Sequence, residues 1–82
     1  MPGVERRMPR YFFHVRQGDT LFEDKEGGVF ADVADASVVA AYDARTITEQ
    51  QSLTGPISEQ SIEIVDEYGD SIAVLPFSRL LN

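Results

Sequence analysis

The sequence predicts an α+β fold, a four-stranded and mainly antiparallel sheet with one helix packed on one face, in the order ββαββ. Residues 11–16 are aromatic and branched with a period of two, as in a strand. Residues 33–53 repeat apolar side chains at spacings of three and four, as in a helix. Residues 61–77 contain two more period-two runs around a turn with glycine, which predicts a second hairpin.

The predicted domain covers residues 8–82. A chain of 82 residues is long enough for one core, which shields about 60 to 65% of the surface that the unfolded chain exposes. Residues 1–7 precede the periodic pattern and a second Met-Pro pair at Met8, so they are interpreted as a flexible arm or as the product of an upstream start codon. We expect marginal stability for a lone copy, which better packing or self-association would improve.

The first hairpin is predicted at the start of the domain. In the run 11–16, period two places Tyr11, Phe13 and Val15 towards the core and the even-numbered side chains on the other face. Residues 17–23 then turn and run back as a short second strand.

A helix is predicted from about Val33 to Leu53. Asp32 is a suitable N-cap, because its carboxylate can accept a hydrogen bond from the amide of Asp35. Gly55 can adopt the left-handed conformation that ends a helix, and the proline after it cannot continue one. The residues that recur on one helical face are Ala36, Val39, Ala40, Ala44 and Ile47.

The second hairpin turns at residues 66–70, after a strand in which Ile62 and Ile64 alternate with polar residues. Its last strand, residues 71–77, is apolar on both faces, as expected of a strand that is covered on two sides. The two apolar rows are Ile72 and Val74 on one face, and Ala73, Leu75 and Phe77 on the other. Because one helix covers one face only, half of the sheet is expected to be bare.

The order of the strands stays open at this point. The first and last strands are apolar on both faces, which favours central positions for them. An order with the third predicted strand beside the first fits nearly as well.

The bare face of the sheet is the predicted interaction surface. Phe12, His14, Leu75 and Phe77 are assigned to it, and such a patch is too apolar for a monomer to leave fully exposed. We therefore expect a homodimer with two sheets face to face, or another protein bound to the same face. Replacing both Phe12 and Leu75 by glutamate is expected to give a folded monomer, and an interface that contains His14 is expected to depend on pH.

Composition argues against nucleic-acid and membrane partners. The chain has 14 acidic and 7 basic residues and a net charge of −7, so most of its surface would repel a phosphate backbone. No apolar run approaches the roughly 20 residues of a membrane span, and the amino end lacks the apolar segment of a secretory signal. The chain has no cysteine, which rules out disulfides and thiolate chemistry. We expect a cytoplasmic protein.

No catalytic, cofactor-binding or metal-binding residue is assigned. His14 is the only histidine and lies in mid-strand, far from any nucleophile motif, so local pairing is the better interpretation. The carboxylates of the acidic loop lack the spacing of a calcium loop, and those of the second turn lie at a hairpin tip, which is normally solvated. These carboxylates are Asp19, Glu23, Asp24 and Glu26 in the loop, and Asp66, Glu67 and Asp70 in the turn.

Several of these motifs together resemble a known family. They are the run PRYFFHV from Pro9 to Val15, the acidic loop, Asp32 before an alanine-rich helix, DEYG at residues 66–69, and a late Pro-Phe pair. They are similar to a family of small uncharacterised bacterial proteins, mostly alphaproteobacterial, that open with MPRYFFHV and are catalogued as a domain of unknown function. The resemblance covers nearly the whole predicted domain. It implies the same fold and a bacterial cytoplasmic setting, and it implies no activity, cofactor or catalytic residue.

Three classes of function follow from these observations. We favour a small interaction or assembly module that is homodimeric and acts through the bare sheet face. The alternative is a ligand- or metal-binding accessory protein that uses the acidic loop. An enzyme is disfavoured, because the chain has one histidine, no cysteine and no catalytic motif.

Overall fold

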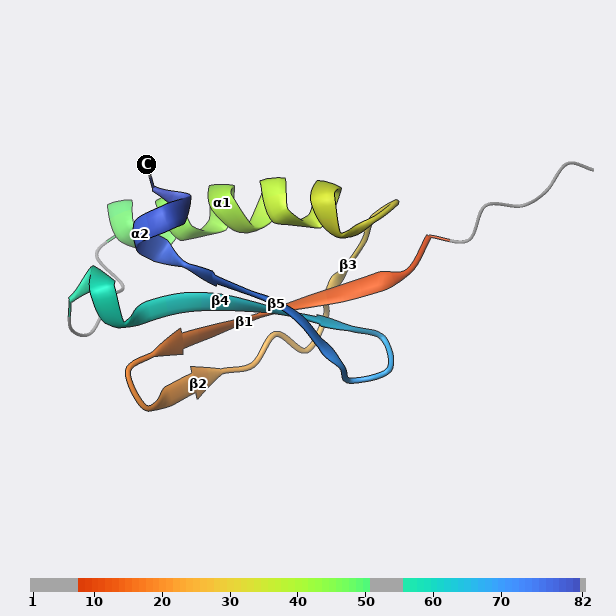
Figure 1. The fold of residues 1–82 in the computed structure, drawn as a ribbon, viewed down its shortest axis with the longest axis horizontal. Helices are drawn as coiled ribbons and strands as arrows, with labels where there is room; N and C mark the ends of the chain where they lie inside the picture. The colour runs from red at the N-terminus through yellow and green to blue at the C-terminus, as the bar shows by residue number, and fades with distance from the viewer. Residues whose placement is uncertain (1–7, 51–55, 82) are drawn as a thin grey trace, which may run out of the picture.

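Two antiparallel hairpins form the sheet (Figure 1). The first consists of β1 (Arg10–Gln17) and β2 (Thr20–Phe22). The second consists of β4 (Gln60–Asp66) and β5 (Ser71–Pro76). β1 and β4 pair antiparallel in the middle, which gives the order β2-β1-β4-β5. The predicted α+β fold is therefore confirmed.

The computed structural model describes residues 8–50 and 56–81. The predicted arm at residues 1–7 and the predicted helix end at Leu53 and Gly55 lie outside the described residues. Within the described part of the chain, no helix is long and apolar enough to cross a membrane.

The third predicted strand lies beside the first. This is the second of the two strand orders that the sequence left open. Val15 of β1 is directly opposite Ile62 of β4, and Phe13 is opposite Ile64. The expectation of a central position for the last strand is wrong, because among the described strands β5 pairs with β4 alone and lies at the edge of the sheet. Its two-sided apolar pattern therefore does not reflect cover on both sides, and Val74 is 60% exposed.

A short strand that the sequence analysis did not predict, β3 (Gly28–Val29), pairs with the start of β1. It is only two residues long, so no hydrophobic period could indicate it. It positions Phe30, whose ring contacts Phe13 edge-on, with ring centroids 5.7 Å apart. The chain after β3 is thereby attached to the core before the helix begins.

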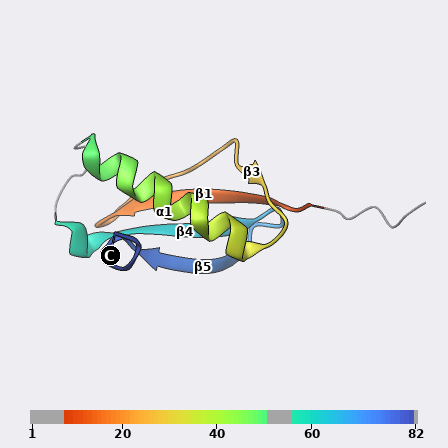
Figure 2. The same ribbon diagram turned by 90° about the horizontal axis from the view of Figure 1, so that it is seen from above.

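Helix α1 (Val33–Glu49) begins where it was predicted. The Asp32 carboxylate accepts a hydrogen bond from the amide of Asp35 at 3.0 Å, which confirms the N-cap. The fully buried residues of the helix are Ala36, Ala40 and Ala44. Because these side chains are small, the helix backbone can lie close to the sheet, and Figure 2 shows it crossing β1 and β4 diagonally.

The chain ends in a second helix, α2 (Phe77–Leu80), which packs beside α1 (Figure 1). A strand was expected up to Phe77, but β5 ends at Pro76, which has no amide hydrogen to continue the ladder. Phe77 is fully buried and joins Ile62 and Ile64 in the core. Both helices lie on the same side of the sheet.

Candidate functional site

The sheet face away from the two helices is the candidate functional site, and we call it the open face. Residues directly opposite each other in an antiparallel pair share a face, so the strand register assigns its members. The open face consists of Phe12, His14, Arg16, Leu21, Ser61, Glu63, Val65, Ser71, Val74 and Pro76. None of the described helices covers it (Figures 1 and 2).

Apolar side chains at the two ends of the open face remain in contact with solvent. Val74 on the outer strand β5 is 60% exposed and Leu21 on β2 is 37% exposed. Phe12 is half-buried and lies opposite Val65, which is buried, at the end of the face towards the β4–β5 turn. The open face therefore has an apolar pair at one end, exposed apolar side chains on its two outer strands, and the polar residues His14, Arg16, Ser61 and Glu63 between those strands.

The charges on the open face are balanced, unlike those of the whole chain. His14 lies opposite Glu63, and Arg16 lies opposite Ser61 on the same pair of strands. One arginine and one glutamate thus occupy a face that belongs to a chain of net charge −7. The long-range repulsion that most of this protein would exert on another acidic surface is weak at this face.

Two of the four predicted interface residues are on the other side of the sheet. Phe12 and His14 lie on the open face, as predicted, but Leu75 lies opposite the fully buried Ile62 and packs against the core. Phe77 is fully buried at the start of α2. The assignment of Leu75 and Phe77 to the open face is therefore wrong.

A β-bulge in the second hairpin explains this error. Val65 lies opposite Ser71 beside the turn, and a β-bulge between Ile64 and Val65 then shifts the register by one residue. Leu75 is therefore opposite Ile62, on the face that the first strand also turns to the core. Val74 is then opposite Glu63, on the open face. Without the bulge, Leu75 would lie opposite Ser61 on the open face, so regular alternation from the turn predicts the wrong row.

The acidic loop owes its structure to one carboxylate. Asp24 accepts hydrogen bonds from the amides of Phe13, Glu26 and Gly27, each at 3.1 Å. The middle of β1 lies between the residues that pair with β2 and those that pair with β3. There the Asp24 carboxylate takes the place of a neighbouring strand. The amide of Asp24 donates to Nδ1 of His14 at 3.0 Å, so a neutral His14 ring carries its proton on Nε2.

These contacts favour the charged form of the Asp24 carboxylate. Burial opposes that charge, but the amides of Gly27, Phe13 and Glu26, together with His14, outweigh burial and hold the pKa of Asp24 below its ordinary value. The other carboxylates of the acidic loop are exposed: Asp19, Glu23 and Glu26. In the described residues, no three His, Cys, Asp or Glu side chains are grouped so that they could hold a metal ion.

The pKa of Asp43 on α1 is shifted in the opposite direction from that of Asp24. Its partial burial raises its pKa above the ordinary value, and the negative charge of Asp24 raises it further. The two carboxylates are thus electrostatically coupled, although one belongs to the helix and the other to the loop at the sheet edge.

The carboxylates of the second turn also serve the backbone. Asp66 Oδ1 accepts from the amides of Tyr68 and Asp70, both at 2.9 Å. Glu67 accepts from the amide of Arg10 at 3.3 Å and so connects the turn to the start of β1. Both groups stabilise the turn, and this geometry gives no reason to pair them as acid and base.

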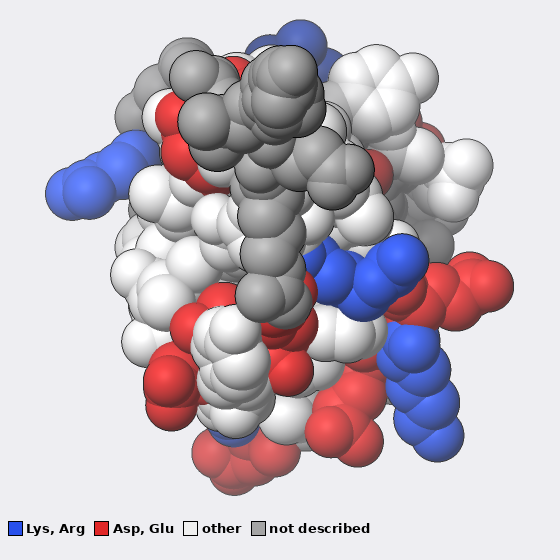
Figure 3. Space-filling view, turned by 90° about the vertical axis from the view of Figure 1, so that its right-hand side faces the viewer, with Lys and Arg blue, Asp and Glu red and all other residues white. Residues whose placement is uncertain are grey.

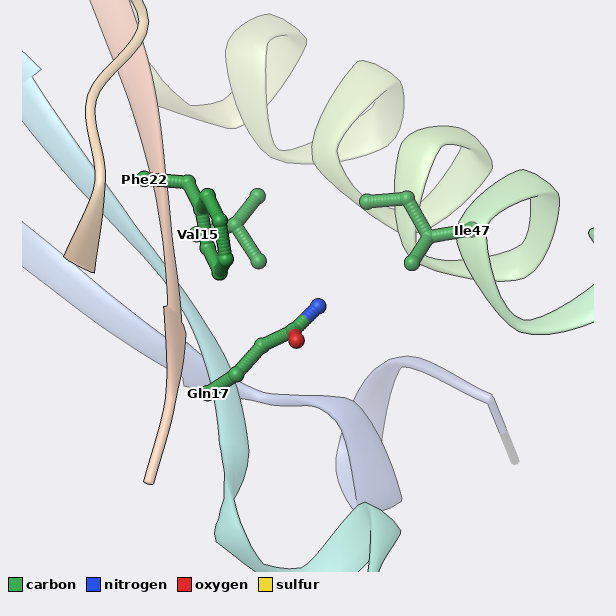
Figure 4. A pocket seen from close by; sticks show the side chains of 4 residues that line it. All are labelled: Val15, Gln17, Phe22 and Ile47. Atoms are coloured by element: carbon green, nitrogen blue, oxygen red, sulfur yellow. The ribbon is translucent and has the colours of Figure 1, made fainter. Parts of the chain in front are cut away.

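An apolar groove lies on the helix side, between α1 and the first hairpin. It has a volume of about 230 Å³ and is lined by Val15, Gln17, Phe22 and Ile47. Figure 4 shows Val15 and Phe22 on one wall, Ile47 of α1 on the other, and the Gln17 amide reaching into the space between them. Phe22 is 51% exposed, so the groove opens to solvent at the β2 edge.

Acidic side chains mark the end of the molecule that carries the β4–β5 turn. Figure 3 views this end, and carboxylates predominate over its lower part, with some basic side chains on its right. Arg10 is held here, because its guanidinium donates to the carbonyl of Glu26 at 2.8 Å. The acidic end is adjacent to the open face and distinct from it.

Comparison with known proteins assigns the chain to a family. No curated protein and no solved structure matches it. The model of one family, described as Domain of unknown function (DUF6894), matches residues 10–78, which include every strand of the sheet. The chain therefore belongs to this family of domains of unknown function.

Proposed function

We propose that this protein is a small cytoplasmic association module that forms a homodimer through the open face of its sheet. The observation that carries the proposal is the exposure of Val74 and Leu21, at 60% and 37%, beside half-buried Phe12 on a face that no described helix covers. Exposed apolar side chains that share one uncovered face are typical of interaction surfaces.

The size of the open face suits a concentration-dependent dimer. Four strands about 4.8 Å apart, with six residues on average at about 3.3 Å, give a face of about 20 Å by 20 Å. Two such faces bury roughly 1,000 Å² in total once side-chain relief is included, which is near the lower limit for a specific interface. A second copy matches this area, and the balanced charges of the face do not oppose it.

The contacts of the polar residues favour a binding role over catalysis. The carboxylates of Asp24 and Asp66 are occupied by backbone amides, and His14 Nδ1 accepts from the amide of Asp24. Each of these groups has a structural task that explains its presence. We therefore propose a non-enzymatic function.

The test is the molar mass in solution, measured by light scattering over a range of protein concentrations. We expect the mass to rise from 9.1 kDa towards twice that value as concentration increases. Val74→Glu is expected to keep the chain at 9.1 kDa with an unchanged circular dichroism spectrum, because it introduces a charge into the dimer interface. Val38→Glu is the matched control, because Val38 is 70% exposed on the helix side and its replacement is expected to leave the dimer intact.

The double replacement of Phe12 and Leu75 by glutamate is no longer a suitable test. Leu75 packs against the core, so a charge there would unfold the chain and abolish association for the wrong reason. A wild-type chain that stays at 9.1 kDa at every concentration contradicts the homodimer.

A second candidate, a ligand-binding accessory role, is favoured by the groove between Val15, Phe22 and Ile47. Its volume of about 230 Å³ suits an apolar group no larger than a substituted aromatic ring. The probe is toluenesulfonate, a single substituted ring, titrated while the methyl NMR signals of Ile47 and Val74 are followed. Shifts at Ile47 but not at Val74 support this candidate, and no shift at Ile47 removes it.

A further inference from the structure

Two unpaired charges of opposite sign lie diagonally across the centre of the open face. Glu63 is directly opposite His14, and Arg16 is two residues further along β1, opposite Ser61. Diagonal neighbours of this kind are about 7–8 Å apart. Within residues 8–50 and 56–81, neither Arg16 nor Glu63 makes an ion pair or a hydrogen bond through its side chain.

An interface over this face must provide partners for both charges. Glu63 is half-buried already, and covering it without a cation would leave a desolvated carboxylate, which is costly. The same holds for Arg16 when a neighbouring surface removes its water. The occupant of the open face therefore has to present an acidic group over Arg16 and a basic group over Glu63, at the same diagonal separation.

A second copy of the chain meets this requirement by symmetry. In a two-fold dimer each surface contacts itself, so residue i of one copy meets residue j of the other and the reverse contact follows. A two-fold axis that lies in the interface, midway between Arg16 and Glu63 and perpendicular to the line joining them, places each arginine over the other copy's glutamate. Two equivalent ion pairs then form, and the His14 and Ser61 side chains lie near the axis.

We infer that the open face recognises a second copy through two reciprocal ion pairs between Arg16 and Glu63, and that these pairs fix the orientation of the dimer. This inference rests on the proposed homodimer and adds to it the contacts that select the partner. Apolar contacts of Val74 and Leu21 supply area, and charges at the centre of an interface select orientation and reject other partners.

Charge reversal tests the inference. Arg16→Glu places glutamate opposite Glu63 twice in the dimer, and Glu63→Arg places arginine opposite Arg16 twice. Since like charges brought together in an interface cost several kcal/mol, each variant alone is expected to raise the dimer Kd by about 100-fold or more. Mixed in equal amounts, the two variants are expected to form a heterodimer with a Kd near that of the wild type, because both contacts are again of opposite sign.

Three controls make the result specific. The doubly reversed chain with Arg16→Glu and Glu63→Arg is expected to recover self-association, which shows that neither substitution prevents folding. Arg45→Glu and Glu49→Arg change the net charge of the chain by the same amounts at exposed positions of α1, and they are expected to leave the dimer Kd within a few-fold of the wild type.

The outcomes separate this inference from the proposed function. If the wild type dimerises and Val74→Glu abolishes the dimer, but the single reversals dimerise like the wild type or their mixture does not recover, the Arg16–Glu63 contact is wrong and the homodimer stands. If the wild type is monomeric at every concentration, both are wrong. Recovery in the mixture and in the doubly reversed chain supports both.

Discussion

On the helix side of the sheet, Ile62 and Ile64 of β4 are fully buried, whereas on the open face Val74 of the neighbouring strand is 60% exposed. Both sides carry branched apolar side chains, and a β-bulge between Ile64 and Val65 interrupts their alternation. The difference lies in what covers them. Two helices cover one side, and the alanines of α1 allow close approach there, while no described helix reaches the other side.

The comparison teaches that a two-sided apolar strand does not identify a strand with two covered sides. β5 has this pattern at the edge of the sheet, where its outer row of side chains meets solvent. An apolar row that the fold leaves exposed is a signal of association instead. The following predictions test the contrast between the two sides, from the largest expected effect to the smallest.

Truncating an apolar side chain should lower the free energy of unfolding much more on the helix side of the sheet than on the open face. Phe77→Ala removes a fully buried aromatic ring and is expected to lower the free energy of unfolding by about 3–5 kcal/mol. Val74→Ala is expected to lower it by less than about 0.5 kcal/mol when measured at a concentration where the chain is monomeric. Urea unfolding followed by circular dichroism measures both, and similar losses would contradict the one-sided core.

Two glycines with positive φ should respond differently to alanine. Gly27 has φ +68°, and a Cβ there would lie 2.6 Å from the Tyr11 carbonyl oxygen and 2.9 Å from the Phe12 ring. Gly69 has φ +88°, but nothing lies within 4 Å of its Cβ position. We expect Gly27→Ala to cost about 3 kcal/mol and Gly69→Ala about 1 kcal/mol. Thermal unfolding checks the order, and equal costs would show that the contact with Phe12 is unimportant.

Asp24→Asn should destabilise the chain by about 1 kcal/mol at neutral pH, because it weakens three hydrogen bonds to backbone amides. Since the folded pKa of Asp24 lies below its ordinary value of 3.8, its contribution is complete above pH 3.8 and is lost as the pH falls through the folded value. The gap between wild type and variant is therefore expected to close in acid. A gap that is constant with pH would contradict this role.

Asp43→Asn should change the free energy of unfolding least of all these variants. Unlike Asp24→Asn, it should raise that free energy. Because burial and the charge of Asp24 raise the pKa of Asp43, its charged form is disfavoured in the folded chain at neutral pH. The variant is expected to be a few tenths of a kcal/mol more stable near pH 7, and the gain is expected to vanish as the pH falls below the ordinary value of 3.8. Urea unfolding at both pH values measures the difference, and a less stable variant would refute the assignment.

Much of the fold could be predicted from the sequence, because the informative signals were local. Asp32 was identified as an N-cap from its position before an alanine-rich segment, and the core side of β1 followed from the alternation of Tyr11, Phe13 and Val15. Strand order could not be predicted, since it depends on which hairpin edges meet. The two-residue β3 and the helix α2 are too short to show a period.

The candidate site was predicted in part. Phe12 and His14 followed from the alternation of the first strand. Leu75 was assigned to the wrong side because a β-bulge shifts the register of the second hairpin by one residue, and Phe77 because the strand ends at Pro76. The structural role of Asp24 could not be predicted, because it depends on the amide of Phe13, which is eleven residues away in the sequence.

Methyl NMR of the wild-type chain over a series of dilutions tests the central claim most directly, because it reports each side of the molecule separately. We expect the methyl signals of Val74 and Leu21 to shift with concentration as the open face becomes covered, while those of the exposed Val38 on α1 stay constant. If the signals of Val74 and Leu21 do not change at any concentration, or if Val38 shifts instead, the open face is not where two copies of this protein meet.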